Sequence, residues 1–320
     1  MINKLKEKIL GGGEISAEEA YELCELAPER REELYEAAAE ITKAFCPVEF
    51  DSCSIVNARS GKCSENCKWC AQSAHFNTKV NVYPLIDREE IQRHAQACKN
   101  AGIKRFSMVT SGRKMSGRDL ERACGYYGEL NREGGVELCA SMGLLTKDEL
   151  QKLWDAGVRR YHCNLEAAPD HFATLCTTHT VEDKIKTINA AREIGFEVCS
   201  GGIIGMGENA RQRVGLALEL RRVRPHSIPI NILCPIPGTP LENSQPLTTD
   251  EIFDAIALFR FIHPHTTLRF AGGRASLTRK EQLKAIKIGM NGGVVGDLLT
   301  TVGSTVADDK ALVAEAGLKF

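Results

Sequence analysis

Residues 51–70 read DSCSIVNARSGKCSENCKWC, and they join a short apolar segment to a loop that carries three cysteines. The cysteines are Cys63, Cys67 and Cys70, spaced Cys-x3-Cys-x2-Cys with Trp69 just before the last thiol. Thiolate is the soft ligand that iron–sulfur clusters take, so three thiols this close can hold three irons of a [4Fe–4S] cluster. Because no fourth cysteine follows nearby, we expect one iron to stay open for another ligand.

Structural zinc, a disulfide and chance each account less well for this cysteine loop. Structural zinc sites usually combine two Cys-x2-Cys pairs, and a second pair is missing near the loop. A disulfide is disfavoured because the chain has 13 cysteines, an odd number, and no recognisable secretory segment. Chance is disfavoured because the three thiols fall together on a glycine-containing polar loop after a predicted strand.

The composition is typical of a folded protein rather than a disordered one. The net charge of −1 gives no bulk electrostatic attraction to nucleic acid or to anionic membranes. The apolar runs are too short to span a bilayer. We therefore expect a cytoplasmic protein that binds neither nucleic acid nor membrane.

The order of elements predicts the fold class. Residues 1–45 are expected to form an N-terminal helical extension, and residues 46–320 repeat a short apolar run, a polar loop and an amphipathic helix. The predicted strands are Asp51–Asn57, Arg105–Thr110, Val136–Ser141, Arg160–Leu165, Glu197–Ile204, Ile228–Leu233, Thr267–Ala271 and Gly293–Val295. The main predicted helices are Asp87–Ala101, Arg118–Glu133, Lys147–Ala156, Val181–Ile194, Ala210–Val223, Thr248–Phe261 and Thr278–Ile288.

Eight strands alternating with helices favour an α/β fold, a closed (β/α)8 barrel of the TIM type, over an open doubly wound sheet. Several helices should end in a left-handed glycine cap, at Gly102, Gly157, Gly195 and Gly289. In such a barrel the active site lies at the C-terminal ends of the strands. The cysteine loop follows the first strand, and it therefore falls at that end.

Longer motifs further along the chain carry a resemblance to a known family. They are Tyr161–Glu166 (YHCNLE), Val198–Glu208 (VCSGGIIGMGE), Ser227–Asn231 (SIPIN), Pro237–Leu241 (PGTPL) and Leu268–Arg274 (LRFAGGR). Together with the cysteine loop they make the chain resemble the biotin synthases, a family of radical S-adenosylmethionine (SAM) enzymes. The three-cysteine motif alone indicates only the superfamily, and the later motifs indicate the family.

The resemblance implies a sulfurtransferase reaction. In this family SAM binds the open iron, and its reductive cleavage gives a 5′-deoxyadenosyl radical that takes hydrogen from dethiobiotin. Sulfur then comes from an auxiliary iron–sulfur cluster deeper in the barrel, usually [2Fe–2S]. The resemblance also implies a flavodoxin- or ferredoxin-type reductant, iron–sulfur assembly machinery as partners, and a homodimer.

Several site residues follow from the same resemblance. Asn231 matches the residue that contacts the SAM ribose, Asn164 matches the one that bridges SAM and dethiobiotin, and Glu166 stands where the family usually has Asp. The other residues expected to contact SAM are Trp69, Gly201, Gly202, Ile203, Gly205, Gly207 and Glu208. Each has a structural alternative: loop packing for the tryptophan, a tight strand–helix turn for the glycines and a solvated loop acid for Glu166.

The auxiliary cluster is where the chain departs from the family. The family pattern uses three cysteines and one arginine from four strands, and Cys139, Cys199 and Arg269 match three of these positions. The fourth position holds Ser107, whose neutral hydroxyl is a poor iron ligand beside a thiolate. Arg269 has a rival role as a buried guanidinium paired with a carboxylate or with SAM.

Two further thiols are candidates for an altered ligand set or nuclearity. Cys163 and Cys234 fall on the fourth and sixth predicted strands, and each could equally be a buried small hydrophobe. The thiols expected to serve only packing or to lie at the surface are Cys24, Cys46, Cys53, Cys98, Cys124 and Cys176.

Competing functions remain at this point. A related radical SAM barrel, of the hydrogenase-maturation or pyrrolysine-pathway type, would share the barrel and the first cluster. An iron–sulfur electron carrier and a structural zinc protein come from other classes.

Overall fold

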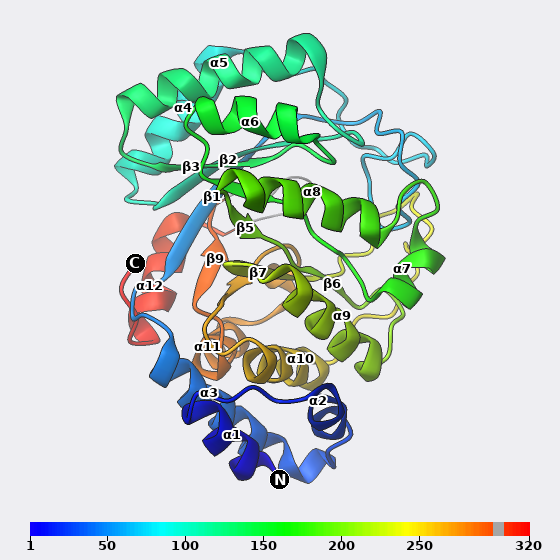
Figure 1. Ribbon diagram of the computed structural model, residues 1–320, viewed down its shortest axis with the longest axis vertical. Coiled ribbons are helices and arrows are strands. Elements are labelled where there is room, and N and C mark those ends of the chain that lie inside the picture. Colours follow the sequence, from blue (N-terminus) through cyan, green and yellow to red (C-terminus); the bar gives the residue numbers. More distant parts are fainter. Residues whose placement is uncertain (297–303) are drawn as a thin grey trace.

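Nine parallel strands and the helices around them make up the computed structural model, which describes residues 1–296 and 304–320 (Figure 1). The strands are β1 (Asp51–Arg59), β2 (Arg105–Thr110), β3 (Glu137–Ser141), β4 (Arg160–His162), β5 (Glu197–Cys199), β6 (Gly202–Ile204), β7 (Ser227–Ile232), β8 (Thr267–Phe270) and β9 (Gly292–Val294). The helices are α1 (Ile2–Leu10), α2 (Ala17–Cys24), α3 (Arg31–Phe45), α4 (Arg88–Asn100), α5 (Gly117–Glu133), α6 (Lys147–Asp155), α7 (Pro169–Leu175), α8 (Val181–Ile194), α9 (Ala210–Val223), α10 (Thr249–Ile262), α11 (Arg279–Ile288) and α12 (Val306–Glu315), with 3-10 turns η1 (Pro28–Arg30) and η2 (Arg274–Ser276).

The sheet closes on itself. Each strand from β1 to β5 pairs in parallel with the next, and so does each strand from β6 to β9. The sheet is closed by the pairing of β1 with β9 and of β5 with β7. The strands β5 and β6 are two parts of one interrupted strand, since Cys199 pairs with Ser227 of β7 and Gly202 pairs with Ile230 in the same register. With β5 and β6 counted as one strand, the barrel has eight strands around its circumference. The predicted (β/α)8 fold is therefore confirmed, and the alternative of an open sheet is excluded.

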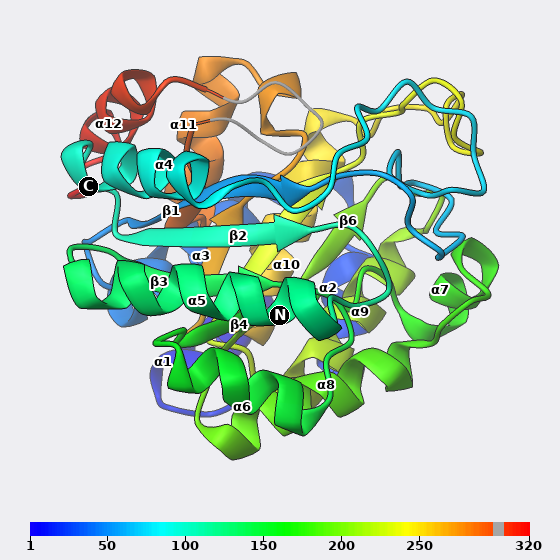
Figure 2. The same cartoon turned by 90° about the horizontal axis from the view of Figure 1, so that it is seen from above.

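Helices cover the outside of the barrel (Figures 1 and 2). In Figure 1, α4, α5 and α6 lie above the strands and α9, α10 and α11 lie below them. The N-terminal helices form an additional layer, in which α3 packs on α10 and α11, and α2 packs on α9 and α10. At the other terminus, Phe320 stacks on Phe50 immediately before β1.

Side-chain caps begin several of the covering helices. Thr146, Thr248 and Thr278 each accept a hydrogen bond from a backbone N–H three residues on, and a glutamate reaches back to complete a capping box. Such a cap stabilises a helix by about 1 kcal/mol. These local signals explain why the helix starts expected from the sequence lie within a residue or two of the observed ones.

Three of the four predicted glycine caps have the left-handed backbone. Gly102, Gly157 and Gly195 have φ values of 67°, 99° and 117°. The prediction for Gly289 is wrong, because its φ is −179° and α11 ends without a left-handed residue.

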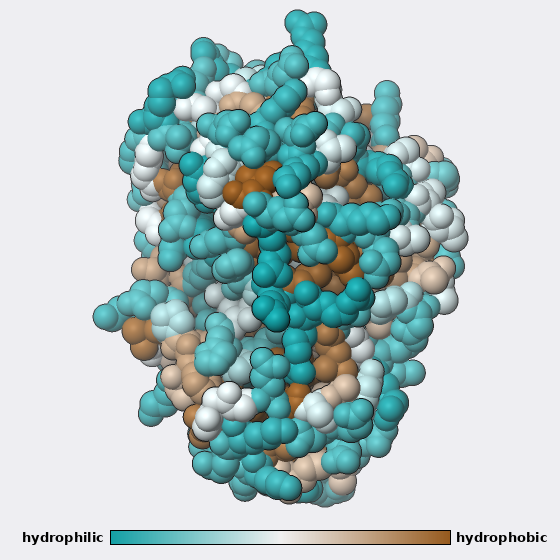
Figure 3. Space-filling model, in the orientation of Figure 1, coloured by the Kyte–Doolittle hydropathy of each residue, from teal (hydrophilic) through white to brown (hydrophobic). Residues whose placement is uncertain are grey.

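The polar character of the outside agrees with the composition. Figure 3 shows one face on which hydrophilic side chains predominate and apolar ones form only small patches. Among the described helices, none combines the length and the apolar character that a bilayer crossing needs.

An ion-pair network fills the barrel interior at the N-terminal ends of the strands. The carboxylate of Asp51 lies 3.0 Å from Arg105 Nε, 3.1 Å from Arg160 Nη1 and 3.1 Å from Arg269 Nη2. Burial opposes ionisation of Asp51, but the three guanidiniums outweigh it and hold the pKa of this carboxyl well below its usual range. Two half-exposed carboxylates at the edge complete the network, Glu137 beside Arg105 and Glu197 beside Arg160. We call these side chains the barrel floor.

Candidate functional site

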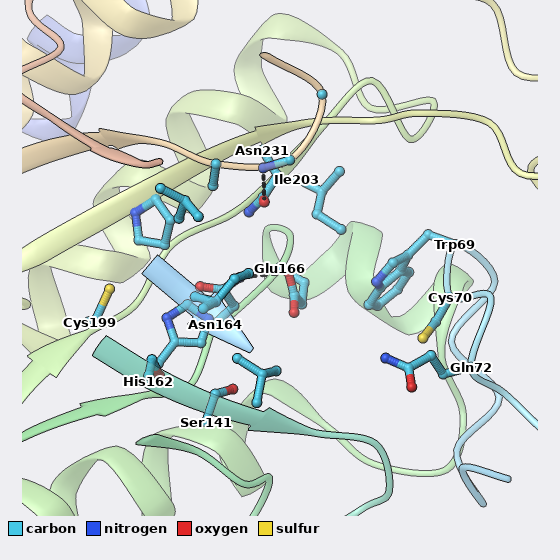
Figure 4. A pocket seen from close by; sticks show the side chains of 18 of the residues that line it. Trp69, Cys70, Gln72, Ser141, His162, Asn164, Glu166, Cys199, Ile203 and Asn231 are labelled. Carbon is cyan, nitrogen blue, oxygen red and sulfur yellow. Dashed lines mark hydrogen bonds between the residues drawn. The ribbon is translucent and has the colours of Figure 1, made fainter. Parts of the chain in front are cut away.

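A cavity of about 440 Å³ runs through the barrel from the cysteine loop to the barrel floor. Figure 4 shows Trp69, Cys70 and Gln72 on one side of it and His162 and Cys199 on the other. Since the parallel strands all point toward the cysteine loop, the mouth of the cavity lies at their C-terminal ends. Active sites of (β/α)8 barrels lie at this end of the strands, as we expect from the sequence.

The structure brings two of the three motif cysteines to the cavity. Cys63 and Cys70 line it, whereas the Cys67 thiol lies 3.6 Å from the thiol of Cys176 on the opposite side of the loop. The Cys176 thiol in turn lies 3.4 Å from His179 Nδ1. Cys67 must turn away from Cys176 to join the other two around a cluster.

Hydrogen bonds hold the backbone of the cysteine loop. The Cys63 N–H donates to Gln72 O at 2.9 Å, and the Cys70 N–H donates to Cys67 O at 3.0 Å. The buried carboxylate of Glu65 lies 2.5 Å from His179 Nδ1, which ties the loop to the segment after α7. Protein contacts therefore hold both the backbone of the loop and its position against the segment after α7.

Burial shapes the chemistry of the two thiols that face the cavity. It raises the pKa of Cys63, and it raises that of Cys70 to about 11. Both are then protonated at neutral pH in the absence of metal. Because thiolates are the ligands of iron–sulfur clusters, loading this loop must release protons.

Two asparagines on the upper wall are fixed by the backbone of neighbouring strands. Asn164 Oδ1 accepts from the Gly201 N–H at 3.0 Å, and its Nδ2 donates to Glu166 at 3.3 Å. Asn231 Oδ1 accepts from the Gly272 N–H at 2.9 Å, and its Nδ2 donates to Gly202 O at 3.0 Å. Both side chains line the cavity in one held orientation, as a ligand-positioning amide requires.

Glu166 lines the same wall with an unusual backbone. Its φ is 75°, in the left-handed region that non-glycine residues seldom occupy. Such a conformation costs on the order of 1–3 kcal/mol and is commonly found at functional sites. Trp69 and Ile203, two of the residues predicted to contact SAM, also line the cavity.

The glycine-rich segment has a packing role. A Cβ atom on Gly201 would lie 2.0 Å from Pro229 O, and one on Gly202 would lie 2.4 Å from Glu166 O. These glycines let β5, β6 and β7 approach one another, and neither lines the cavity. The close contact is therefore with protein backbone.

The turn after β6 also lies outside the cavity lining. The Glu208 carboxylate accepts from the N–H groups of Gly205 and Met206, both at 2.7 Å, and it pairs with Arg213 at 2.8 Å. Gly205 and Gly207 have φ values of 96° and 93°, which the turn itself requires. Glu208 is thus occupied as the organiser of this turn.

Deeper in the barrel the structure brings the expected auxiliary-site residues together. Ser107, Cys139, Cys199 and Arg269 all line the cavity, and Ser107 pairs with Cys139 across β2 and β3. Next to them, His162 pairs with Cys199 across β4 and β5. Burial raises the pKa of Cys199, but the imidazole of His162 and the guanidiniums of Arg269 and Arg160 together outweigh this and bring the pKa below its ordinary value.

Arg269 belongs to both the deep cavity and the barrel floor. Its Nε donates to Ser227 Oγ at 3.0 Å, and its Nη1 donates to Asp51 O at 3.2 Å and to Gly293 O at 3.3 Å. Nη2 pairs in charge with Asp51 but has no aligned hydrogen-bond acceptor among the described residues. The guanidinium of Arg269 is thus paired with a carboxylate, which is the alternative role that the sequence leaves open. Its Nη2 can still donate a hydrogen bond to a further partner.

The structure does not bring the two extra candidate thiols to Cys139 and Cys199. Cys163 alternates with the inward residues His162 and Asn164, so its side chain lies on the outer face of the sheet and does not line the cavity. Cys234 lines the mouth, two residues beyond the end of β7. At about 3.3 Å per residue, an extended chain places it roughly 23 Å further along than Ser227, the partner of Cys199.

Cys53, unlike Cys163, lies inside the barrel although the sequence does not mark it as a candidate ligand. The sequence assigns it to packing, yet it lines the deep cavity together with Cys139 and Cys199. The thiol of Cys139 is the main influence that lowers the pKa of the Cys53 thiol, to about 7. The sequence also gives no role to His162 or Arg160, which line the same space. The alternation of β1, where Asp51 and Ile55 face inward, is the pattern that could have identified Cys53.

The donor chemistry fits an iron–sulfur cluster at each end of the cavity. The three motif cysteines belong to the loop at the mouth, and the thiols of Cys53, Cys139 and Cys199 line the cavity near the barrel floor. Soft thiolates are the ligands that such clusters take. The Nη2 of Arg269, which is ion-paired with Asp51 but has no aligned hydrogen-bond acceptor among the described residues, adds a buried donor that a bound group can use.

Two family models match the chain. Residues 58–220 match the radical SAM superfamily, and residues 229–319 match the Biotin and Thiamin Synthesis associated domain. The first match includes the cysteine loop and the strands β2 to β6, and the second includes most of β7 together with β8 and β9.

Curated relatives match the chain from end to end. It is 50% identical to the biotin synthase of Parabacteroides distasonis over 316 residues, which cover 99% of this chain and 96% of that protein. It is 47% identical to the biotin synthase of Porphyromonas gingivalis, covering 100% and 96% of the two chains. The biotin synthase of Campylobacter hominis is also 47% identical, with 100% and 98% covered.

Solved structures share the barrel at low sequence identity. Methylornithine synthase (PylB) superposes with a TM-score of 0.84 at 17% identity, covering 98% of this chain and 96% of that one. HydG, a maturase of the [FeFe]-hydrogenase, has a TM-score of 0.85 at 15% identity, covering 99% and 74%. These likenesses concern the fold alone.

Proposed function

Since this chain belongs to the biotin synthases of the radical SAM superfamily, we propose that it inserts sulfur into dethiobiotin to form biotin. The observation that carries the proposal is that two sets of cysteines lie at opposite ends of one cavity, one set in the cysteine loop and the other near the barrel floor. A cluster near the mouth and a sulfur donor near the barrel floor would leave the substrate between them.

The cysteine loop would hold the first cofactors. Cys63, Cys67 and Cys70 are the ligands for a [4Fe–4S] cluster, with SAM as the partner of the open iron. Bound there, these cofactors supply the radical chemistry that acts on unactivated C–H bonds. The contribution of the protein is to hold the loop in place and to keep the reaction away from water.

The SAM contacts that we propose are those that face the cavity. The ring of Trp69 is adjacent to Cys70 and packs edge-on against Phe172, with centroids 6.2 Å apart, so it forms a firm wall. Ile203 supplies an apolar surface, and the fixed amide of Asn231 can hydrogen-bond a ribose hydroxyl. The carboxylate of Glu166 can accept from a second hydroxyl.

The substrate position follows from the wall between the two thiol groups. Asn164 presents its amide there, held by the Gly201 N–H, and can contact both SAM and the ureido group of dethiobiotin. The apolar side chains of Ile55, Val109 and Ile232 line the same space and suit an aliphatic chain. Orienting the reacting C–H bond and excluding water are the tasks of these residues.

The deep site would hold the auxiliary iron–sulfur cluster as the sulfur donor. Cys139, Cys199 and Arg269 stand at three positions of the family pattern, in which the cluster is usually [2Fe–2S]. Ser107 at the fourth position is a poor ligand, so we propose an altered ligand set in this chain.

The remaining partners come from the family resemblance. We propose a flavodoxin- or ferredoxin-type reductant, iron–sulfur assembly machinery that rebuilds the auxiliary cluster, a homodimer and a cytoplasmic location. The exposed, largely polar surface and a net charge near zero are compatible with a protein that works in free solution.

Anaerobic incubation with dethiobiotin, SAM and a reductant tests the proposal, with biotin measured by mass spectrometry. Biotin should form with the loaded protein and should be absent with the Cys63→Ala/Cys67→Ala/Cys70→Ala variant. Cleavage of SAM without biotin would instead favour a related radical SAM barrel. Zinc without iron in the purified protein would favour a structural zinc protein.

A further inference from the structure

We propose that Cys53 of β1 replaces the ligand that Ser107 cannot supply, so that Cys53, Cys139 and Cys199 together hold the auxiliary cluster. This inference rests on the proposed function, because it needs an auxiliary cluster near the barrel floor. It assigns a metal-binding role to a residue that the family pattern leaves without one.

The position of Ser107 explains why a replacement is needed. It faces the cavity and pairs with Cys139 across β2 and β3, so it stands on the correct face of the correct strand. Its side chain is buried, yet it offers only a neutral hydroxyl. A soft iron–sulfur cluster therefore lacks a thiolate at this point of the barrel.

Cys53 faces the same space from the adjacent strand. It pairs with Arg105, two residues before Ser107, and lies between Asp51 and Ile55, whose side chains also face inward. Neighbouring strands lie about 4.8 Å apart, and two residues along a strand span about 6.6 Å. Cys53 is thus displaced from Ser107 by one strand across the sheet and by two residues along the strand. Because its side chain points to the barrel axis, its thiol can reach a cluster bound in the same space.

The three deep thiols share one set of neighbours. Cys53 and Cys139 line the same part of the cavity, where each thiol affects the pKa of the other, and the guanidinium of Arg269 is close to both Cys53 and Cys199. The guanidinium of Arg160 is likewise close to Cys139 and Cys199. A group held by three thiolates is negatively charged, and these two cations offset that charge where water is excluded.

Ordinary packing accounts less well for Cys53. A free cysteine usually behaves as a small hydrophobe and fills an apolar core. Cys98, a buried thiol on α4 that lies within the apolar core, has that environment. Cys53 instead lies among the charged side chains just above the barrel floor and is not part of the apolar core.

His162 is the main rival for the same role. Its imidazole lines the cavity, and it interacts with the Cys199 thiol. Imidazole can ligate iron, so both residues have to be tested. Thiolate is the better match for a sulfide-bridged cluster, and Cys53 lies on the strand next to Ser107, two residues nearer the barrel floor.

The test uses full-length protein that lacks the first cluster, the Cys63→Ala/Cys67→Ala/Cys70→Ala variant. After anaerobic reconstitution with iron and sulfide, its remaining iron, acid-labile sulfide and Mössbauer spectrum report the auxiliary site alone. Adding Cys53→Ala should lower the bound iron at least tenfold. Adding Cys98→Ala, a matched buried thiol outside the cavity, should leave it unchanged.

A relocated ligand separates loss of ligation from loss of folding. In the same background, Cys53→Ser conserves the volume and should also lose the iron. The combination Cys53→Ser/Ser107→Cys moves the thiol back to β2 and should regain at least half of it. Regain in a chain with the same number of thiols supports ligation, because a general defect in folding would persist.

Three results would overturn the assignment. Retention of iron and an unchanged Mössbauer spectrum in the Cys53→Ala variant would show that the thiol is dispensable. Loss of iron with His162→Ala but not with Cys53→Ala would make the imidazole the ligand. A background variant that binds no iron would overturn the proposed auxiliary site itself, and this outcome is visible before Cys53 is changed.

Discussion

Neutralising Asp51 should destabilise the barrel far more than neutralising Glu137, although both carboxylates belong to the barrel floor. Asp51 is 14% exposed and pairs with three guanidiniums whose side chains are 4–6% exposed. Glu137 is 49% exposed and pairs with Arg105 and, at the longer distance of 4.0 Å, with Lys104. The two substitutions therefore remove the same charge from sites of very different burial.

The expected magnitudes follow from this difference. Removing one partner of a buried ion pair costs about 3–5 kcal/mol, because the remaining charges stay buried without compensation. Asp51→Asn keeps the shape and an acceptor, so we expect about 3 kcal/mol. A half-exposed pair contributes about 1 kcal/mol or less, which sets the expectation for Glu137→Gln. The gap of about 2 kcal/mol is a factor of about 30 in the folding equilibrium.

Urea unfolding of the iron-free, reduced protein measures the difference, followed by far-ultraviolet circular dichroism. The folded state holds the pKa of Asp51 below that of the unfolded chain, so its stabilisation is present above the unfolded value of about 3.9 and is lost as the pH falls further. The gap between the wild type and Asp51→Asn should thus be constant from pH 8 to about pH 5 and close below pH 4. A loss under 1 kcal/mol at pH 7, or one equal to that of Glu137→Gln, would refute the reasoning.

Three further predictions concern other buried groups. Arg260 is fully buried and donates to several backbone carbonyls, and no carboxylate of residues 1–296 or 304–320 pairs with it. Arg260→Lys should therefore lower the free energy of unfolding by at least about 2 kcal/mol, and equal urea midpoints for variant and wild type would contradict this. Burial lowers the pKa of His263 to about 4, so the unfolded state takes up the proton first and stability should fall by about 3 kcal/mol between pH 6.5 and pH 4. Urea unfolding of His263→Gln should show a shallower decline over this range, and an identical decline would exclude the assignment. Mild oxidation of iron-free protein should link Cys67 to Cys176, whose sulfurs lie 3.6 Å apart; peptide mapping without this link would argue against the loop geometry.

Much of the barrel could be predicted because its determinants are local. Helix starts follow from capping residues such as Thr248, whose hydroxyl accepts a hydrogen bond from the backbone N–H of Glu251, three residues further along the chain. Apolar runs separated by helices predict parallel strands, and their number predicts closure. The interruption between β5 and β6 could not be read from the sequence, because it arises where Gly201 packs against Pro229 of the next strand.

The mouth of the site was easier to predict than its depth. The cysteine spacing is a local pattern, and both asparagines follow from motifs. The deep ligands depend on which face each strand turns inward, and a shift of one residue exchanges the two faces. This is why Cys163, one residue from His162, lies outside the barrel, while Cys53 lies inside it.

Glu208 and its glycines illustrate a different limit. Their motif resembles a nucleotide-contacting turn, but the carboxylate is used by two backbone N–H groups and by Arg213. A sequence shows that a turn needs glycine and an acidic residue. It does not show whether that acid points to a ligand or to its own turn.

Among the described residues, the barrel floor closes one end of the cavity, which leaves the mouth beside the cysteine loop as its entrance. Asp51 and its guanidiniums occupy the lower end, so everything that reaches the deep thiols must pass the cysteine loop. If sulfur is drawn from the deep site, then dethiobiotin, outgoing biotin and the iron and sulfide for repair share one route. Repair must then wait for the product to leave, and a chain that retains biotin tightly would be limited to a single round.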